Sequence, residues 1–163
     1  MKYLKLLKLL YLADRESMKR HGHPISGDSY VSMDHGPVLS RTFNLIKGAG
    51  QFEDRGWGHW IADEANYVVS LRHKASRDAL DELSEADVDV LNDVHAKFGR
   101  MKPWDLVDYV HRYCREWQDP AGSSMPIPYE AVFKALGRSP AEAKKLAARI
   151  EREHRIDKVF ARL

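Results

Sequence analysis

Eight histidines and a single cysteine are the residues of this 163-residue chain that most invite a metal or catalytic site. His21 and His23 stand two residues apart, but no third ligand is placed beside them by spacing. The chain has no H-E-x-x-H motif and no zinc-type Cys/His pattern. His95 and His111 fall on the apolar stripes of two predicted helices, so we expect both to be buried and hydrogen-bonded. We therefore predict no metal site.

A hydrolase would need a nucleophile beside a histidine and an acid. Asp14 and His35 are the candidate pair, and Ser40 or Cys114 would have to attack. Neither of these residues lies in a nucleophile motif such as G-x-S-x-G, and no P-loop or dinucleotide-binding glycine motif predicts a cofactor. We expect a protein without catalytic activity or cofactor, and the hydrolase is the weakest alternative.

Basic residues gather in the C-terminal segment, 138–163, which carries eight Lys/Arg against four Asp/Glu. Lys145, Arg149 and Arg152 are the candidate contacts to nucleic-acid phosphates. The acids of the segment dilute this charge, because spacings such as Glu151 to Arg155 permit salt bridges along a helix. A nucleic-acid-binding regulator is therefore the second interpretation, and a solvated helix face the simpler one.

Composition indicates one globular domain, with 44% hydrophobic and 31% charged residues. The longest apolar run is interrupted by Lys5 and Lys8, so we expect no membrane span. The acidic and basic residues at 14–16 stand where a signal peptide would have its small-residue cleavage site. Because the chain has one cysteine and so no disulfide framework, we predict a cytoplasmic protein.

The leucine-rich stretch 2–20 predicts a helix that is apolar on most of its circumference and therefore central to the fold. We expect its lysines and Arg15 to occupy the remaining polar face, and we expect the helix to end at Gly22, two residues before Pro24.

Short apolar segments then predict a small sheet. Residues 30–33 form a candidate strand, and 57–61 with 67–71 form a candidate hairpin to which 30–33 adds a third strand. Between them, Pro37 at a first helical position predicts that residues 34–38 open a second helix.

Helices are predicted next at 84–99 and 103–114, with Trp104 on the apolar stripe of the second. The Pro, Gly and Ser residues of 119–128 favour a linker. A short helix at 129–136 and a last helix, opened by the capping box at Ser139, complete the chain. The fold class is mainly α with a small antiparallel sheet or hairpin, in one compact domain around the N-terminal helix.

Five aromatic residues are hard to bury all at once in a domain of this size. Exposed aromatics are the residue type that most often anchors a protein partner, although a core position is equally compatible with their pattern. They are Trp57, Trp60, Trp104, Trp117 and Phe52.

An ordered set of motifs resembles the Panacea domain, the SocA-like antitoxin-associated family of bacterial and prophage genes. The run at 5–14, K-L-L-K-L-L-Y-L-A-D, matches the family's K-L-x-K-L-L-Y-x-A, and Gly22-x-Pro24-Ile25 and the G-P-V turn at 34–38 follow. Later matching positions are Ser84, Glu85, Leu91, Val94, Phe98, Gly99, Leu106, His111 and Trp117. The chain departs at Val110, where the family often has threonine. We predict a Panacea domain at 1–137 and a basic C-terminal helix at 138–163, packed on it or extending from it.

The resemblance implies an antitoxin that neutralises a cognate protein toxin by direct contact, without a cofactor. One member type of the family delivers its toxin to a protease, so a protease is a second expected partner. Nucleic acid and membrane are not expected as partners in this interpretation.

The resemblance also places a candidate partner-binding surface on the first helix and the Gly-Pro turn. A turn that opens a helix would present free backbone N–H groups to an acidic or carbonyl group, while Asp14 would accept a basic one. The other interpretation is that Asp14 and His35 only fix the turn to the first helix. The predicted partner-binding residues are Tyr11, Asp14, His35, Gly36, Pro37 and Val38, with Arg41 added on helix geometry.

Overall fold

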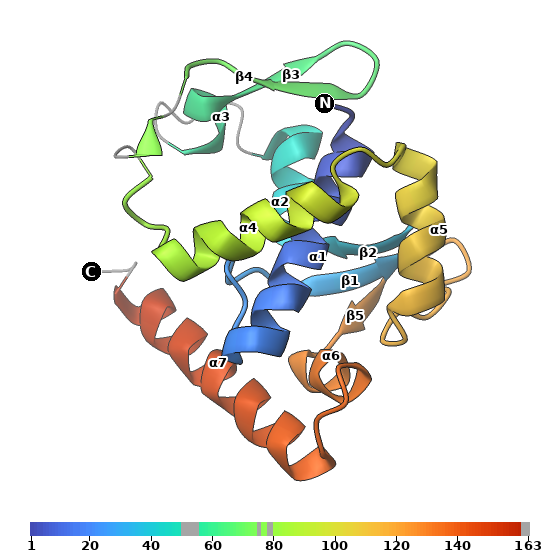
Figure 1. Cartoon of the computed structure of the whole chain (residues 1–163), viewed down its shortest axis with the longest axis vertical. Coiled ribbons are helices and arrows are strands. Elements are labelled where there is room, and N and C mark those ends of the chain that lie inside the picture. Colours follow the sequence, from blue (N-terminus) through green and yellow to red (C-terminus); the bar gives the residue numbers. More distant parts are fainter. Residues whose placement is uncertain (50–55, 75, 78–79, 161–163) are drawn as a thin grey trace.

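The computed structural model describes residues 1–49, 56–74, 76–77 and 80–160, and one helix runs through its centre (Figure 1). Phe52 lies outside the described residues. The elements in chain order are α1 (Tyr3–His21), β1 (Tyr30–Met33), β2 (Gly36–Leu39), α2 (Ser40–Asn44), the π-type turn η1 (Leu45–Ala49), α3 (Trp57–Trp60), β3 (Ile61–Glu64), β4 (Val68–Leu71), α4 (Glu85–Phe98), α5 (Pro103–Tyr113), β5 (Met125–Ile127), α6 (Tyr129–Ala135) and α7 (Pro140–Phe160). The predicted fold class, mainly α with a small antiparallel sheet, is confirmed.

The central position predicted for the N-terminal helix is confirmed. α1 contacts α4, α5, α6 and β2, and it buries Leu7, Leu9 and Leu12 against them. It ends where the sequence predicts, because Gly22 adopts the left-handed conformation (φ 79°) and donates its N–H to the carbonyl of Met18.

The main sheet has three antiparallel strands in the order β2-β1-β5. Val31 of β1 is paired with Val38 of β2 on one side and with Pro126 of β5 on the other. The prediction that 30–33 extends the 57–71 hairpin is wrong, because the adjacent strand β2 and the distant strand β5 occupy both of its edges. The predicted linker at 119–128 is also wrong in part, since it contains β5.

The second sheet is the predicted hairpin, β3 paired with β4. Its first arm was predicted at 57–61 but begins only at Ile61, because residues 57–60 form a single helical turn. Ile61 closes this turn by donating its N–H to the carbonyl of Trp57. The hairpin lies beside the N-terminus (Figure 1), and the N–H of Val69 donates to the carbonyl of Met1.

The predicted helix start at 34–38 is wrong. Residues 34–35 are the two-residue turn of a hairpin, and Gly36 takes a positive φ of 95° as β2 begins. Pro37 lies in β2, an edge strand, where a residue without an N–H is tolerated. The Gly-Pro pair at 36–37 was predicted to open a helix, and in the structure it follows the hairpin turn and begins β2.

The next helix, α2, begins at Ser40, and its first N–H groups are occupied. The carboxylate of Asp28 accepts the N–H groups of Arg41 and Thr42, both at 2.9 Å, and the hydroxyl of Thr42 at 3.0 Å. The free donors expected to face a partner at this point are thus bound within the chain.

The helices of the C-terminal half begin as predicted. Ser84 forms a capping box with Asp87, and the hydroxyl of Ser139 interacts with both the backbone N–H and the carboxylate of Glu142. α7 packs Ala143, Ala147 and Ile150 into the same core as α1. The boundary between 1–137 and 138–163 as separate units stays a prediction.

Two residues predicted to lie on the buried apolar faces of these helices are exposed instead. His95 is exposed, since the buried positions of α4 are Val90, Val94 and Phe98. Trp104 is 59% exposed, because it lies in the first turn of α5 above a cavity and not above another element.

None of the helices within the described ranges combines the length and the apolar character that crossing a bilayer requires.

We predict that Gly36→Ala destabilises the protein by about 2 to 4 kcal/mol, from left-handed strain together with overpacking. A Cβ at Gly36 would lie 2.6 Å from Cγ2 of Val110, closer than two non-bonded carbon atoms pack in proteins. The matched control is Gly137→Ala, where φ is also positive (89°) but no atom lies within 4 Å of the added carbon. Urea unfolding checks both variants, and equal losses of stability would contradict the clash.

Candidate functional site

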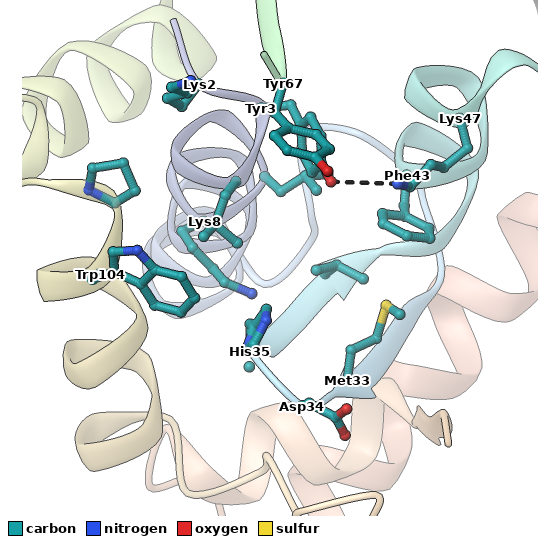
Figure 2. A pocket seen from close by; sticks show the side chains of 15 residues that line it. Lys2, Tyr3, Lys8, Met33, Asp34, His35, Phe43, Lys47, Tyr67 and Trp104 are labelled. Atoms are coloured by element: carbon teal, nitrogen blue, oxygen red, sulfur yellow. Dashed lines mark hydrogen bonds between the residues drawn. The ribbon is translucent and has the colours of Figure 1, made fainter. Parts of the chain in front are cut away.

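A cavity of about 550 Å³ opens between the first half of α1, the β1–β2 turn, α2 with η1, and the start of α5 (Figure 2). Its walls are mostly aromatic and aliphatic, with three lysines and one acid among them. The lining residues are Lys2, Tyr3, Leu4, Leu7, Lys8, Met33, Asp34, His35, Gly36, Val38, Phe43, Lys47, Tyr67, Pro103 and Trp104.

Lys8 forms the floor of this cavity. Its side chain is fully buried, and its Nζ donates to the carbonyl of Pro37 at 2.9 Å. Burial lowers the pKa of Lys8 to about 7, since a charged amine loses most of its hydration there. Its predicted place on the polar face of the first helix is wrong, because β2 and α5 pack over that side of α1.

His111 and Trp117 flank the floor. The two rings stack with centroids 4.0 Å apart, and Nε1 of Trp117 donates to the carbonyl of Met33 at 3.0 Å. Nε2 of His111 is buried and has no hydrogen-bond partner among the described residues, so the hydrogen bond predicted for it is not found at that atom. Burial, and then the nearby Lys8, lowers the pKa of His111, which favours the neutral ring.

One rim of the cavity is the pair His35 and Trp104. Their rings meet edge to face with centroids 5.0 Å apart. In Figure 2 the amine of Lys8 points toward the space between these two side chains. The exposed pair therefore stands between the buried amine and solvent.

Aromatic residues and a lysine form the opposite rim. Tyr67 is 68% exposed and packs edge to face on Tyr3, with centroids 5.6 Å apart. Nζ of Lys47 donates to the hydroxyl of Tyr3 at 3.3 Å and lies 5.7 Å from the ring centroid of Phe43 (Figure 2). The rim is thus apolar in surface and positive in charge.

Tyr11 and Asp14, predicted to contact a partner, are both buried instead. The hydroxyl of Tyr11 donates to Glu116 at 2.6 Å, and Glu116 also binds Arg15. Burial first, and then Glu116, raises the pKa of Tyr11 well above its ordinary value. Tyr11 therefore takes part in an internal network and presents nothing to a docking partner.

The carboxylate of Asp14 accepts four hydrogen bonds within the chain. The donors are the N–H groups of Ile25 and Ser26 and the hydroxyls of Ser26 and Tyr30. Burial raises the pKa of Asp14, and these bonds oppose the rise. Asp14 thus fixes the segment after α1, and its hydrogen bonds go to residues 25, 26 and 30 and not to the Gly-Pro turn that the alternative interpretation names.

The remaining predicted partner-binding residues divide between interior and surface. Gly36, Pro37 and Val38 are buried in β2, whereas His35 and Arg41 are exposed. Of the exposed pair, His35 lines the cavity, and so do the buried Gly36 and Val38. Asp14 is not among the lining residues, so this cavity does not unite the acid and the histidine that the hydrolase alternative requires.

The basic residues proposed to contact nucleic acid, Lys145, Arg149 and Arg152, are exposed on α7. Arg149 pairs with Glu153 at 2.9 Å, which neutralises part of the face. In the part of the chain that the structure describes, no group of three or more His, Cys, Asp or Glu side chains is placed to hold a metal ion. Nucleic-acid binding stays a prediction.

Sequence reasoning missed Lys8, Phe43 and Tyr67 as site residues. The one available signal was the position of Lys8, three residues before Tyr11 and four before Leu12, which places it next to buried apolar positions on α1. The cavity itself joins segments too distant in the chain for spacing to predict.

A family model described as antitoxin SocA-like, Panacea domain, matches residues 6–118. No curated protein and no solved structure matches the chain. The matched range contains the floor of the cavity and most of its rim.

We predict that Lys8→Met stabilises the protein most at low pH. The amine has a pKa near 10.5 in the unfolded chain and about 7 in the folded one, so between these values unfolding takes up a proton. The stability advantage of the variant over the wild type should therefore decrease by about 1.4 kcal/mol per pH unit as the pH rises from 7 toward 10.5. Urea unfolding across this range measures it. An advantage that does not change with pH would mean that Lys8 stays charged in the fold.

Proposed function

Because this chain belongs to the antitoxin SocA-like Panacea domain family, whose model covers residues 6–118, we propose that it is an antitoxin that binds its cognate toxin in the cavity above Lys8. The toxin is a protein encoded beside it in a bacterial or prophage genome, and the complex forms in the cytoplasm. Binding masks the toxin, and no bond is made or broken. The alternative, that binding delivers the toxin to a protease, uses the same surface.

One observation carries this proposal: two large aromatics stand exposed at opposite rims of one apolar cavity. Trp104 and Tyr67 are 59% and 68% exposed. Tryptophan and tyrosine are the residue types that most often dominate the binding energy of protein interfaces. A groove edged by them offers a partner an apolar anchor site.

The depth of the cavity also supports a protein partner. A volume of about 550 Å³ accommodates one or two large side chains. Much of its wall comes from α1, β2 and the start of α5, three elements that bury side chains in the core, so that part of the shape is formed before binding. A partner then orders few groups of this chain, which limits the entropy that binding loses.

We predict that Trp104→Ala and Tyr67→Ala each weaken the complex with the toxin at least tenfold, a loss typical of interface anchors. The matched control is Tyr113→Ala, which removes an equally exposed aromatic (53%) from a position that does not line the cavity. The test co-expresses each variant with the product of the adjacent gene and measures rescue of growth and the affinity of the purified pair.

An adjacent gene product that is harmless on its own would contradict the antitoxin function. Rescue by both cavity variants at the level of Tyr113→Ala would place the toxin on another surface. Toxin abundance during rescue separates the two modes, because masking leaves the amount of toxin unchanged while delivery to a protease reduces it.

A further inference from the structure

The floor of the cavity holds a buried amine, that of Lys8, for which the described residues supply no acid. Within the described ranges, no carboxylate lies within ion-pair distance of Nζ of Lys8, and the carbonyl of Pro37 is its one acceptor. Arg15 is also a largely covered basic residue of α1, but it has an acidic partner, since Glu116 binds it at 2.7 Å. An ammonium can donate three hydrogen bonds, so Lys8 retains unused capacity.

A second polar group lies near Lys8 and is also unsatisfied, although its residue, His111, does not line the cavity. Nε2 of His111 is buried without a partner in the described part of the chain. A Cβ added to Gly36 would lie 3.3 Å from Nζ of Lys8 and 3.4 Å from Cδ2 of His111, so both side chains border the same glycine. Natural folds leave few buried polar atoms unpaired, so two such groups beside one glycine single out this part of the interior.

The charged residues around the cavity are mostly positive, as the binding of an acidic group requires. Lys2 and Lys47 are exposed on its rim, and Asp34 is the one acidic residue of the lining. The lining thus combines three lysines with aromatic and aliphatic walls. An anionic group attached to a large apolar group is complementary to both features.

We propose that the segment which the partner protein inserts here carries an acidic side chain beside a large apolar one, and that its carboxylate binds the amine of Lys8 between His35 and Trp104. This inference rests on the proposed function, since it names the chemistry of the partner at the same site. The apolar side chain occupies the space lined by Tyr3 and Phe43.

Entry of the carboxylate requires His35 and Trp104 to part. Their edge-to-face contact is the cover over Lys8 on the cavity side (Figure 2), and both side chains are exposed. A bound carboxylate replaces the water that the buried amine has lost and stabilises its charged form. A neutral amide in the same place supplies no charge, so the site distinguishes acid from amide.

The competing explanation is that Lys8 only fixes β2 to α1. Lys5 provides the control, because its Nζ also donates from α1 to a backbone carbonyl, that of Gly99 at 2.6 Å, but it does not line the cavity. A structural role would make Lys5→Met and Lys8→Met equivalent in every binding measurement.

The test titrates the full chain with two blocked peptides, acetyl-Phe-Glu-Leu-amide and its isostere acetyl-Phe-Gln-Leu-amide, and follows backbone and tryptophan N–H signals by NMR. We expect the acidic peptide to bind the wild type at least tenfold more tightly and to shift the signals of residues 34–38 and Trp104. Lys8→Met should abolish this preference, and Lys5→Met should retain it.

Equal binding of the two peptides to the wild type, no binding of the acidic peptide, or a preference that survives in Lys8→Met would each overturn the inference. If Lys8→Met does not fold, the Cε signal of Lys8 in the wild type decides, since it should move with the acidic peptide alone. Binding of free 3-phenylpropionate as tight as that of the acidic peptide would identify a small-acid site and also overturn it. No toxin is used, so toxin neutralisation can succeed or fail independently.

Discussion

The hydrogen bond from the amine of Lys8 to the carbonyl of Pro37 is the contact on which the arrangement of the cavity depends. It joins the central helix to an edge strand inside the protein, where both residues are buried. The strand comes this close because Gly36 has no side chain and Val110 of α5 fills the space a Cβ would need. Three elements therefore meet at one point, and the cavity lies directly above it.

Two buried carboxylates hold the segment between α1 and the sheet in a comparable way. Asp14 accepts donors from Ile25, Ser26 and Tyr30, and Asp28 occupies the first N–H groups of α2. The carbonyl of Asp28 also accepts the hydroxyl of Tyr129 at 2.6 Å, which connects α6 to the same segment. Asp14, predicted to contact a partner, and Asp28, for which no role was predicted, thus both satisfy backbone donors within the chain.

Local signals in the sequence predicted the elements well and the site poorly. The helix end at Gly22 and the capping boxes at Ser84 and Ser139 depend on neighbouring residues, so they could be predicted. The Gly-Pro pair at 36–37 suits both a helix start and a hairpin turn, and only its pairing with β1 decides between them. Likewise, the burial of Lys8 is imposed by strands and helices that arrive later in the chain, which no periodicity of the first helix reveals.

The residues that line the cavity end at Trp104, and the family match ends soon after, at residue 118. Beyond residue 118, β5, α6 and α7 contribute nothing to the cavity lining. They complete the sheet on the far edge of β1 and bury Ala143, Ala147 and Ile150 against the core. If the cavity is where a partner binds, the C-terminal elements act on recognition indirectly, by keeping β1 and α1 in place. Changes on the exposed face of α7 should then leave partner binding intact, whereas changes on its buried face should weaken binding only to the extent that they unfold the domain.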